Sequence, residues 1–189
     1  MATQDSRIKL KRSTVTAIVP TVPSSNDHTD GTWIATDIYK GELFYNQADG
    51  VLWSRDDNGV RCLSGSVAVT LSSAQVLALN TTPITLIGAV AGYAIEAVSV
   101  SVSIDYNSVA YATNTNLIII TDTAGNPQYK RDYLLLQTVD TTYKFAEVAP
   151  TSGTQLIANK ALTATTATGD PTAGDSPITI FVNYRLIPV

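Results

Sequence analysis

The sequence predicts an all-β protein: a small N-terminal β-meander followed by an antiparallel β-sandwich of jelly-roll type. Three observations predict this fold class. Short apolar runs are separated by frequent turn residues, β-branched and small polar residues dominate after residue 63, and no stretch carries a convincing helical periodicity. We therefore expect about ten short strands in the second part of the chain, enough for two packed sheets.

Charge divides the chain into two parts. Residues 1–63 hold more than half of the charged side chains, whereas residues 64–189 are rich in Thr, Ser, Val and Ala. We expect an N-terminal segment over 1–63 and a β domain over 64–189. Because Gly and Ser favour flexible connections, Ser64-Gly65-Ser66 is the expected hinge between them.

The first part is expected to form short strands joined by turns. Alternation in RIKLKR predicts a basic edge strand over 7–12, and residues 20–31 form a Pro-rich polar loop. Asp49-Gly50 predicts a two-residue type I′ turn, because both central residues of that turn have positive φ. Further strands are expected at 33–38, 43–48, 51–55 and 60–63, with a second turn at 56–59.

In the second part, nearly every segment is predicted to be a strand. The expected strands are 66–71, 75–79, 83–87, 94–106, 115–121, 132–138, 142–148, 154–158, 160–166 and 177–187. Within 94–106 the apolar residues share one face and the serines the other: Val98, Val100, Val102 and Ile104 against Ser99, Ser101 and Ser103. A small, uncharged outer face suits the close approach of another surface.

Composition excludes several classes of protein. A net charge of −4 and a pI of about 4.8 argue against general nucleic-acid binding, which needs a basic surface. Cys62 is the single cysteine, so no intrachain disulfide is possible. No apolar run is long enough to span a membrane and no signal peptide is visible, so we expect synthesis in a reducing cytoplasm and no membrane insertion.

Motifs for catalysis, cofactors or metals are weak. His28 is the single histidine, and neither a GxSxG elbow nor a Gly-rich phosphate loop occurs. Residues 26–37 match a calcium loop only loosely, and the carboxylate pairs Asp56/Asp57 and Asp170/Asp175 fall in turns, where Asp is favoured. We therefore expect no enzyme activity, no catalytic residue, no cofactor and no metal.

One part of the sequence resembles a known family. The RIKLKRS strand, the spacer and then GELFYNQADGVLWSRDDNG resemble the N-terminal segment of tailed-bacteriophage fibre and appendage proteins. The remainder is similar to the compact jelly-roll modules that end such proteins. The resemblance implies a structural virion protein (a head fibre, a tail fibre or a capsid decoration) that attaches to the particle through its N-terminal segment and projects a homotrimeric β domain. The resemblance leaves three locations on the particle open: the capsid, the tail and the baseplate.

This interpretation assigns candidate residues to two surfaces. The attachment residues are expected to be Arg7, Lys9, Lys11, Arg12, Glu42 and Trp53. The alternative function is a receptor- or carbohydrate-binding module for host attachment, with a host-surface glycan as partner and Tyr106, Tyr111 and Tyr129 as contacts, because tyrosine rings stack on sugars. A third possibility, a polysaccharide-degrading enzyme, would need a carboxylate-lined cleft for which this part of the chain has few charged residues.

Overall fold

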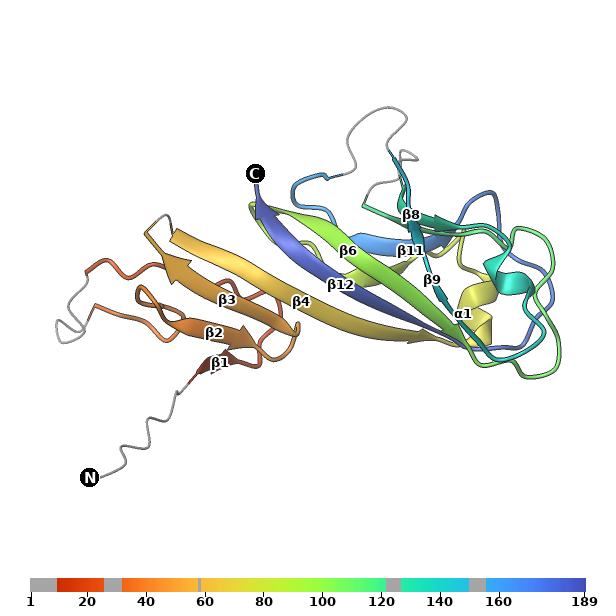
Figure 1. Ribbon diagram of the computed structural model, residues 1–189, viewed down its shortest axis with the longest axis horizontal. Coiled ribbons are helices and arrows are strands. Elements are labelled where there is room, and N and C mark those ends of the chain that lie inside the picture. Colours follow the sequence, from red (N-terminus) through yellow and green to blue (C-terminus); the bar gives the residue numbers. More distant parts are fainter. Residues whose placement is uncertain (1–9, 26–31, 58, 122–126, 150–155) are drawn as a thin grey trace, which may run out of the picture. The chain divides into compact units, whose positions relative to one another are not determined.

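The computed structural model describes residues 10–25, 32–57, 59–121, 127–149 and 156–189 (Figure 1). The chain forms two compact units, Met1–Gly65 and Ser66–Val189. Strand β4 (Gly59–Leu71) runs through the boundary without interruption. The predicted hinge at Ser64-Gly65-Ser66 is therefore wrong, because these three residues continue a strand.

The first unit is built on a small sheet with the order β1-β2-β3-β4. Its strands are β1 (Lys11–Ser13), β2 (Leu43–Asn46), β3 (Val51–Asp56) and the first part of β4. β2, β3 and β4 form an antiparallel meander, and β1 adds to the edge as a parallel partner of β2. The meander and the edge position of β1 are as predicted, but the strand expected at 33–38 is wrong, because those residues form a turn and a single bridge from Asp37 to Thr21.

The β2–β3 hairpin differs from the predicted two-residue turn. The last pair is Asn46 with Val51, so the loop has four residues, and of Asp49 and Gly50 only the glycine has positive φ (66°). Asn46 shapes this loop: its Oδ1 accepts from Ala48 N at 3.1 Å, while its Nδ2 donates to the Asp49 carboxylate at 2.7 Å. Hydrogen bonds of the Asn46 side chain, at the end of β2, therefore stabilise a four-residue loop in place of the predicted two-residue turn.

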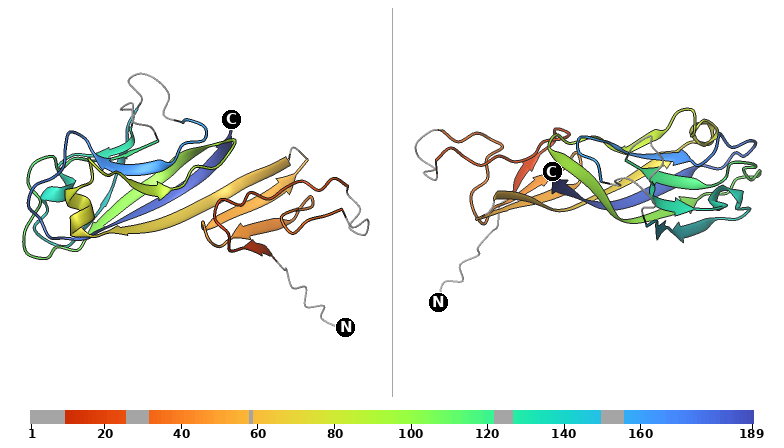
Figure 2. Two further views of the ribbon diagram at one scale, coloured as in Figure 1. Left: turned by 180° about the vertical axis from the view of Figure 1, so that it is seen from behind. Right: turned by 90° about the horizontal axis from the view of Figure 1, so that it is seen from above.

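The second unit is a sandwich of two antiparallel sheets (Figure 1, Figure 2). One sheet has the order β4-β12-β6-β9 and the other β10-β8-β7-β11-β5. The strands beyond β4 are β5 (Ile84–Ile87), β6 (Tyr93–Ile104), β7 (Leu117–Ile120), β8 (Pro127–Arg131), β9 (Thr141–Lys144), β10 (Ala146–Glu147), β11 (Leu162–Thr166) and β12 (Ile178–Pro188). The predicted all-β sandwich is confirmed, and its jelly-roll winding stays a prediction.

Two expected strands are helical instead. Residues Ser73–Leu77 form α1, which begins with a capping box between Ser72 and Gln75 and buries Val76. Residues Leu134–Leu136 form the 3-10 helix η1. The capping box is visible in the sequence as Ser-x-x-Gln and outweighs the strand propensity of 75–79. Residues 154 and 155 of the strand expected at 154–158 lie outside the described residues.

A β-bulge changes the alternation in β6. Asn183 pairs with Ser99 and Tyr184 with Ala97, so Val98 is the extra residue and is 57% exposed instead of buried. Beyond the bulge, Val100, Val102 and Ile104 lie inward as predicted. One extra residue reverses the facing of the residues next to it, so that Ile95 and Ala97 are buried there, and Ala94 is buried as well.

Near the bulge, backbone groups of β6 form hydrogen bonds with side chains of β8 and with the backbone of the segment after β9. Gln128 accepts from Ala97 N at 2.8 Å and donates to Ile95 O at 2.9 Å. The Tyr129 hydroxyl donates to Val98 O at 2.8 Å, and Phe145 N donates to Val100 O at 2.9 Å. β9 continues the pairing from Ser101 to Ile104.

The core of the second unit lies between its sheets. On β12 the predicted inward face is confirmed, since its alternate side chains are at most 5% exposed: Ile178, Ile180, Val182, Tyr184 and Leu186. Opposite sheet strands contribute Leu117, Ile119, Leu162 and Ala164, all fully buried. Period-two burial on both sheets therefore gives this unit a single continuous apolar layer.

Candidate functional site

The predicted attachment residues do not form one exposed surface. Trp53 is only 1% exposed and packs on the covered face of β3, so its predicted role as a contact is wrong. Lys11 and Glu42 form an ion pair with each other at 3.2 Å. Arg12 is exposed on the edge strand β1, and Arg7 and Lys9 lie outside the described residues.

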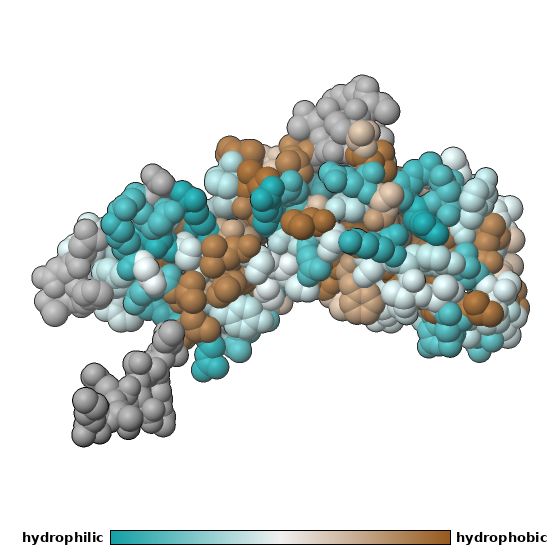
Figure 3. Space-filling view, viewed as in Figure 1, coloured by the Kyte–Doolittle hydropathy of each residue, from teal (hydrophilic) through white to brown (hydrophobic). Residues whose placement is uncertain are grey.

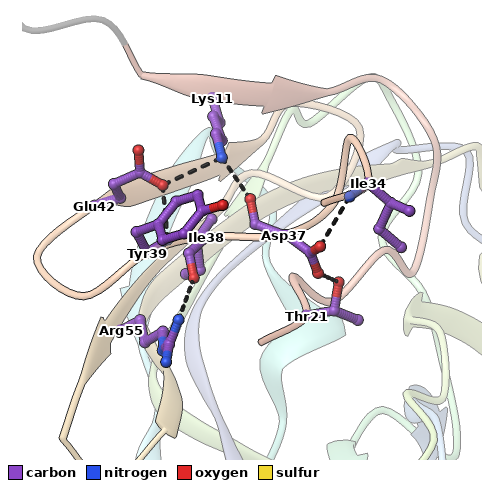
Figure 4. A network of polar contacts seen from close by, with 8 residues as sticks. All are labelled: Lys11, Thr21, Ile34, Asp37, Ile38, Tyr39, Glu42 and Arg55. Atoms are coloured by element: carbon purple, nitrogen blue, oxygen red, sulfur yellow. Dashed lines mark hydrogen bonds and ion pairs between the residues drawn. The ribbon is translucent and has the colours of Figure 1, made fainter. Parts of the chain in front are cut away.

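Lys11 and Glu42 belong to a polar network centred on Asp37 (Figure 4). The Asp37 carboxylate accepts from the Thr21 hydroxyl at 2.6 Å and from Ile34 N at 2.8 Å. Lys11 Nζ donates to the Asp37 carbonyl oxygen at 2.6 Å. Three segments that are distant in sequence, around residues 11, 21 and 37, are thereby joined on one side of the sheet.

Aromatic rings complete the surroundings of Lys11. Its ammonium lies 5.0 Å from the centre of the Trp33 ring and 5.3 Å from that of Tyr39, within cation–π range. Glu42 also accepts from Tyr39 N at 2.7 Å, and Arg55 donates to the Ile38 carbonyl at 3.0 Å. The cationic groups of this cluster are therefore bound within the unit.

The network keeps Asp37 ionised although its residue is only 4% exposed. The Thr21 hydroxyl, the Ile34 amide and then the charges of Lys11 and Arg55 lower the pKa of Asp37, against the opposing effect of burial. With its pKa lowered, Asp37 is present as a carboxylate, which accepts hydrogen bonds and has no proton to donate. The cluster therefore acts as a clamp that joins Thr21 and the segment 34–42 to strand β1.

Two of the three tyrosines predicted as receptor contacts are buried. Tyr111 is 1% exposed and donates to Ser176 O at 2.6 Å, and burial, with a smaller contribution from Asp175, raises the pKa of Tyr111 to about 12. Tyr129 is 5% exposed and bonds to the β6 bulge. Both predictions are wrong, because these rings pack in the core. Tyr106 is half-buried and donates to Ser108 O at 2.6 Å.

Asp175 organises the loop that carries Tyr106. Its Oδ1 accepts from Ser108 N at 3.1 Å and Val109 N at 2.9 Å, and its Oδ2 accepts from Asn107 Nδ2 at 3.0 Å and from the Ser108 hydroxyl. These bonds, the Ser108 hydroxyl first, lower the pKa of Asp175 to about 2. The two residues of the Asp170/Asp175 pair bind different loops. Asp175 binds residues 107–109, whereas Asp170 accepts from Asn80 N and Thr81 N.

The Asp175 loop is expected to lose stability in acid. A carboxyl group with a lowered folded pKa stabilises the fold above its ordinary pKa, and this contribution disappears as pH falls toward about 2. Thermal melting of the wild type between about pH 5 and pH 2 should therefore show a steeper fall than melting of Asp175→Asn. Asp105→Asn, which removes an exposed carboxylate of the neighbouring loop, is the control. Equal pH profiles for wild type and Asp175→Asn would contradict this role.

Tyr133 is an exposed aromatic residue, unlike Tyr111 and Tyr129. It is 67% exposed and its backbone is left-handed, with φ of 55°. Asn116 Oδ1 accepts from Tyr133 N at 2.8 Å, and the following Leu134 and Leu135 are buried, which anchors the loop. The sequence signal was weak, because the segment 132–138 has the composition of a strand.

The described residues hold no group of three or more His, Cys, Asp or Glu side chains able to bind a metal ion. The parts of the calcium-like loop at 26–31 lie outside the described residues, and both carboxylate oxygens of Asp37 bind protein donors. No described helix has the length and apolar character needed to cross a bilayer.

Comparisons with known proteins give little. No protein-family model matches the chain, and no curated protein matches it. Among solved structures, a chain of the "Cyanophage Pam1 capsid asymmetric unit" aligns over 66% of this chain and 82% of that chain, with 18% identity and a TM-score of 0.34. A likeness at that TM-score carries no argument about this protein.

Proposed function

We propose that this protein is a non-enzymatic structural component of a bacteriophage particle, a head or tail fibre or a capsid decoration. The first unit attaches to other virion proteins and the second projects from the particle. Copies of the chain associate, with a homotrimer as the expected assembly, after synthesis in the host cytoplasm. Neither nucleic acid nor a cofactor takes part.

The observation that carries this proposal is that Asp carboxylates accept hydrogen bonds from donor groups in loops of the chain. Three Asp residues of the described part of the chain have a lowered pKa, caused first by a hydrogen bond from a hydroxyl group: Asp37 from Thr21, Asp170 from Thr81 and Asp175 from Ser108. A general acid or base needs a pKa near the working pH, which for a carboxylate means a raised value. These groups are arranged to hold loops, as in a structural protein.

The outer face of the second unit supports association. Along β6 and β12 most of its residues are small or polar, such as Ser99, Ser101, Thr179 and Asn183, and Arg185 is paired with Glu96. Val98 and Phe181 are the exposed apolar exceptions on these two strands. Figure 3 shows this surface as mostly teal and white with isolated brown side chains. Because Arg185 and Glu96 neutralise each other, this face has little net charge along β6 and β12 to discourage sheet surfaces from meeting.

The N-terminal resemblance supports attachment through the first unit. Its hairpin strands, β2 and β3, fold as the resemblance implies, and β1 lies at the edge of the sheet with Arg12 exposed. Arg12 is therefore available at the edge of the sheet, although Lys11 is bound within the unit.

The test is the location of the protein on intact particles. Antibodies raised against residues 66–189 should label purified phage particles in electron microscopy, and the position of the label separates head, tail and baseplate. Particles that lack the chain in mass spectrometry and bind no more antibody than preimmune serum would overturn the proposal.

Exposure of Tyr133 favours one second candidate, a glycan-binding role at host attachment. A rigidly held, exposed tyrosine is a suitable stacking platform for a sugar ring. On a glycan array, Tyr133→Asn should abolish binding while keeping the left-handed backbone, which Asn tolerates. Phe181→Ala, which removes an aromatic ring that is 42% exposed on β12, is the matched control. Wild-type protein that binds no glycan would reject this role.

A further inference from the structure

Strand β1 and the turn after it lie at the edge of the sheet in the first unit (Figure 1). We call this segment, residues 11–17, the β1 strap. The structure describes all of its residues, and none of their side chains is buried: Lys11 and Ser13 are half-buried and the other five are exposed, Val15 to 59%. Burial of apolar surface, the main favourable contribution to folding, therefore does little to hold this segment.

Hydrogen bonds hold the strap to the β2–β3 hairpin instead. Asn46, a buried residue at the end of β2, donates from its Nδ2 to a backbone carbonyl of the strap at 3.0 Å. The Asp49 carboxylate accepts from Ala17 N at 2.7 Å, and Gln47 N donates to Ser13 O at 2.8 Å. Asn46 Nδ2 also donates to the Asp49 carboxylate at 2.7 Å, so the hairpin loop has a bond of its own that does not need the strap.

Lys11 fastens the other end of the strap (Figure 4). Its ammonium donates to Asp37 O at 2.6 Å, lies 3.2 Å from the Glu42 carboxylate, and lies 5.0 Å and 5.3 Å from the ring centres of Trp33 and Tyr39. All four partners belong to the segment 33–42. Within that segment, the Asp37 carboxylate accepts hydrogen bonds that do not come from β1. Lys11 therefore ties the strap to a segment that is held by other contacts.

The main contacts of the rest of the first unit do not depend on the strap. The bridge between Thr21 and Asp37, in which Ile38 N donates to Thr21 O at 3.0 Å, contains no strap residue. The same is true of the β2–β3 pairing and of the buried pair Phe44 and Trp53. Segments with little buried apolar area open at a lower free energy than the core of the same unit. A weakly held edge segment therefore lies beside a more stable meander.

We propose that the β1 strap opens as one piece while the β2–β4 meander stays folded, and that Lys11 sets how often it opens. Opening frees the edge of β2 that faces β1, and an unpaired strand edge is the part of a sheet to which another strand can add. This deepens the proposed function, on which it rests for the role of the first unit in attachment. The attachment unit then has a closed state and an open state.

The test is hydrogen exchange of single backbone amides in the full chain, followed by NMR. The strap amides are those of Ala17 and Gln47, which donate across the contact between the strap and the hairpin. The reference amides are those of Ile38 and of Trp53 in β3, which belong to buried residues outside the strap. In the wild type, the strap amides should exchange about tenfold or more faster than the reference amides.

Lys11→Gln tests the fastening, because it removes the ammonium and keeps a long polar side chain. It should speed exchange of both strap amides by about tenfold, since the closed state loses a charge-assisted hydrogen bond and an ion pair. Neither strap amide donates to Lys11, so a joint change shows that the strap opens as one piece. Exchange of the reference amides should stay as in the wild type.

Lys40→Gln is the matched control. It removes the same charge from an exposed lysine of the first unit that pairs with Asp57, and it should leave all four amides unchanged. A measurement on the wild type needs no variant: raising the salt concentration from about 0.01 M to about 1 M should speed exchange of the strap amides relative to the reference amides. Salt screens the pair of Lys11 and Glu42, whose side chains are 27% and 39% exposed.

The outcomes separate this proposal from the proposed function. Equal exchange rates for strap and reference amides in the wild type mean that the first unit opens as a whole, which overturns the strap. So does Lys11→Gln if it speeds all four amides equally or none of them. Antibody labelling of particles does not depend on these rates, so the virion location can stand when the strap falls, and the reverse.

Discussion

Gly174→Ala is expected to destabilise the second unit by about 3 kcal/mol or more. Gly174 has φ of 91°, which strains any residue with a Cβ. An added methyl group would also overlap the Tyr111 ring, lying 2.6 Å from its Cε1. Tyr111 cannot retreat easily, because it is buried and its hydroxyl is bonded to Ser176 O. Urea unfolding followed by circular dichroism measures the loss.

Gly92→Ala separates strain from overlap. Gly92 also has positive φ, 76°, but a Cβ there meets no atom within 4 Å. Backbone strain alone should then reduce the free energy of unfolding by about 1 kcal/mol. If the two variants lose equal stability, the close approach of Tyr111 to Gly174 is not what requires glycine.

Asp37→Ala is expected to destabilise the first unit by about 2–3 kcal/mol. The change leaves the Thr21 hydroxyl and the Ile34 amide without their carboxylate partner beside the buried position of Asp37. It also removes the charge that faces Lys11 and Arg55. Trp53 fluorescence in the Trp33→Phe background, measured against urea, reports on this unit.

Acid should reproduce part of this effect in the wild type. Because the folded pKa of Asp37 is lowered, its stabilisation is complete above the ordinary pKa of the carboxyl group and is lost as pH falls through the folded value. Asp37→Asn should be intermediate. Asp57→Ala removes an exposed carboxylate paired with Lys40 and should change stability by less than about 0.5 kcal/mol. A similar loss of stability in Asp37→Ala and in Asp57→Ala would contradict the role of Asp37 as a clamp.

The strands were predictable where hydrophobic periodicity alone decides. β12 shows this best, because its five inward residues follow strict alternation and pair regularly with β6 up to one bulge. The bulge at Val98 was not predictable, since it depends on the register of a partner strand that follows much later in the chain. α1 was missed although its Ser72–Gln75 capping box was in the sequence.

The candidate site was less predictable than the fold. Lys11 and Glu42 were predicted to be attachment residues, whereas the structure uses both within the unit, in contacts that span up to 31 residues of sequence. No spacing rule marks Asp37 as their centre. Exposure also depends on tertiary packing, which is why Tyr111 and Tyr129, predicted as contacts, are buried in the structure while Tyr133 is exposed.

Hydrogen bonds that the second unit makes to the backbone of β6 limit how this sandwich can contact another molecule. From Ile95 to Val100 the backbone of β6 is bonded by Gln128, Tyr129 and Phe145, and β9 takes over from Ser101. An incoming strand from another molecule finds these hydrogen-bonding groups already taken, so open-ended sheet extension cannot start on β6. Assembly through the faces of the sheets can stop at a fixed number of copies, whereas assembly through an unprotected strand would continue into a fibril.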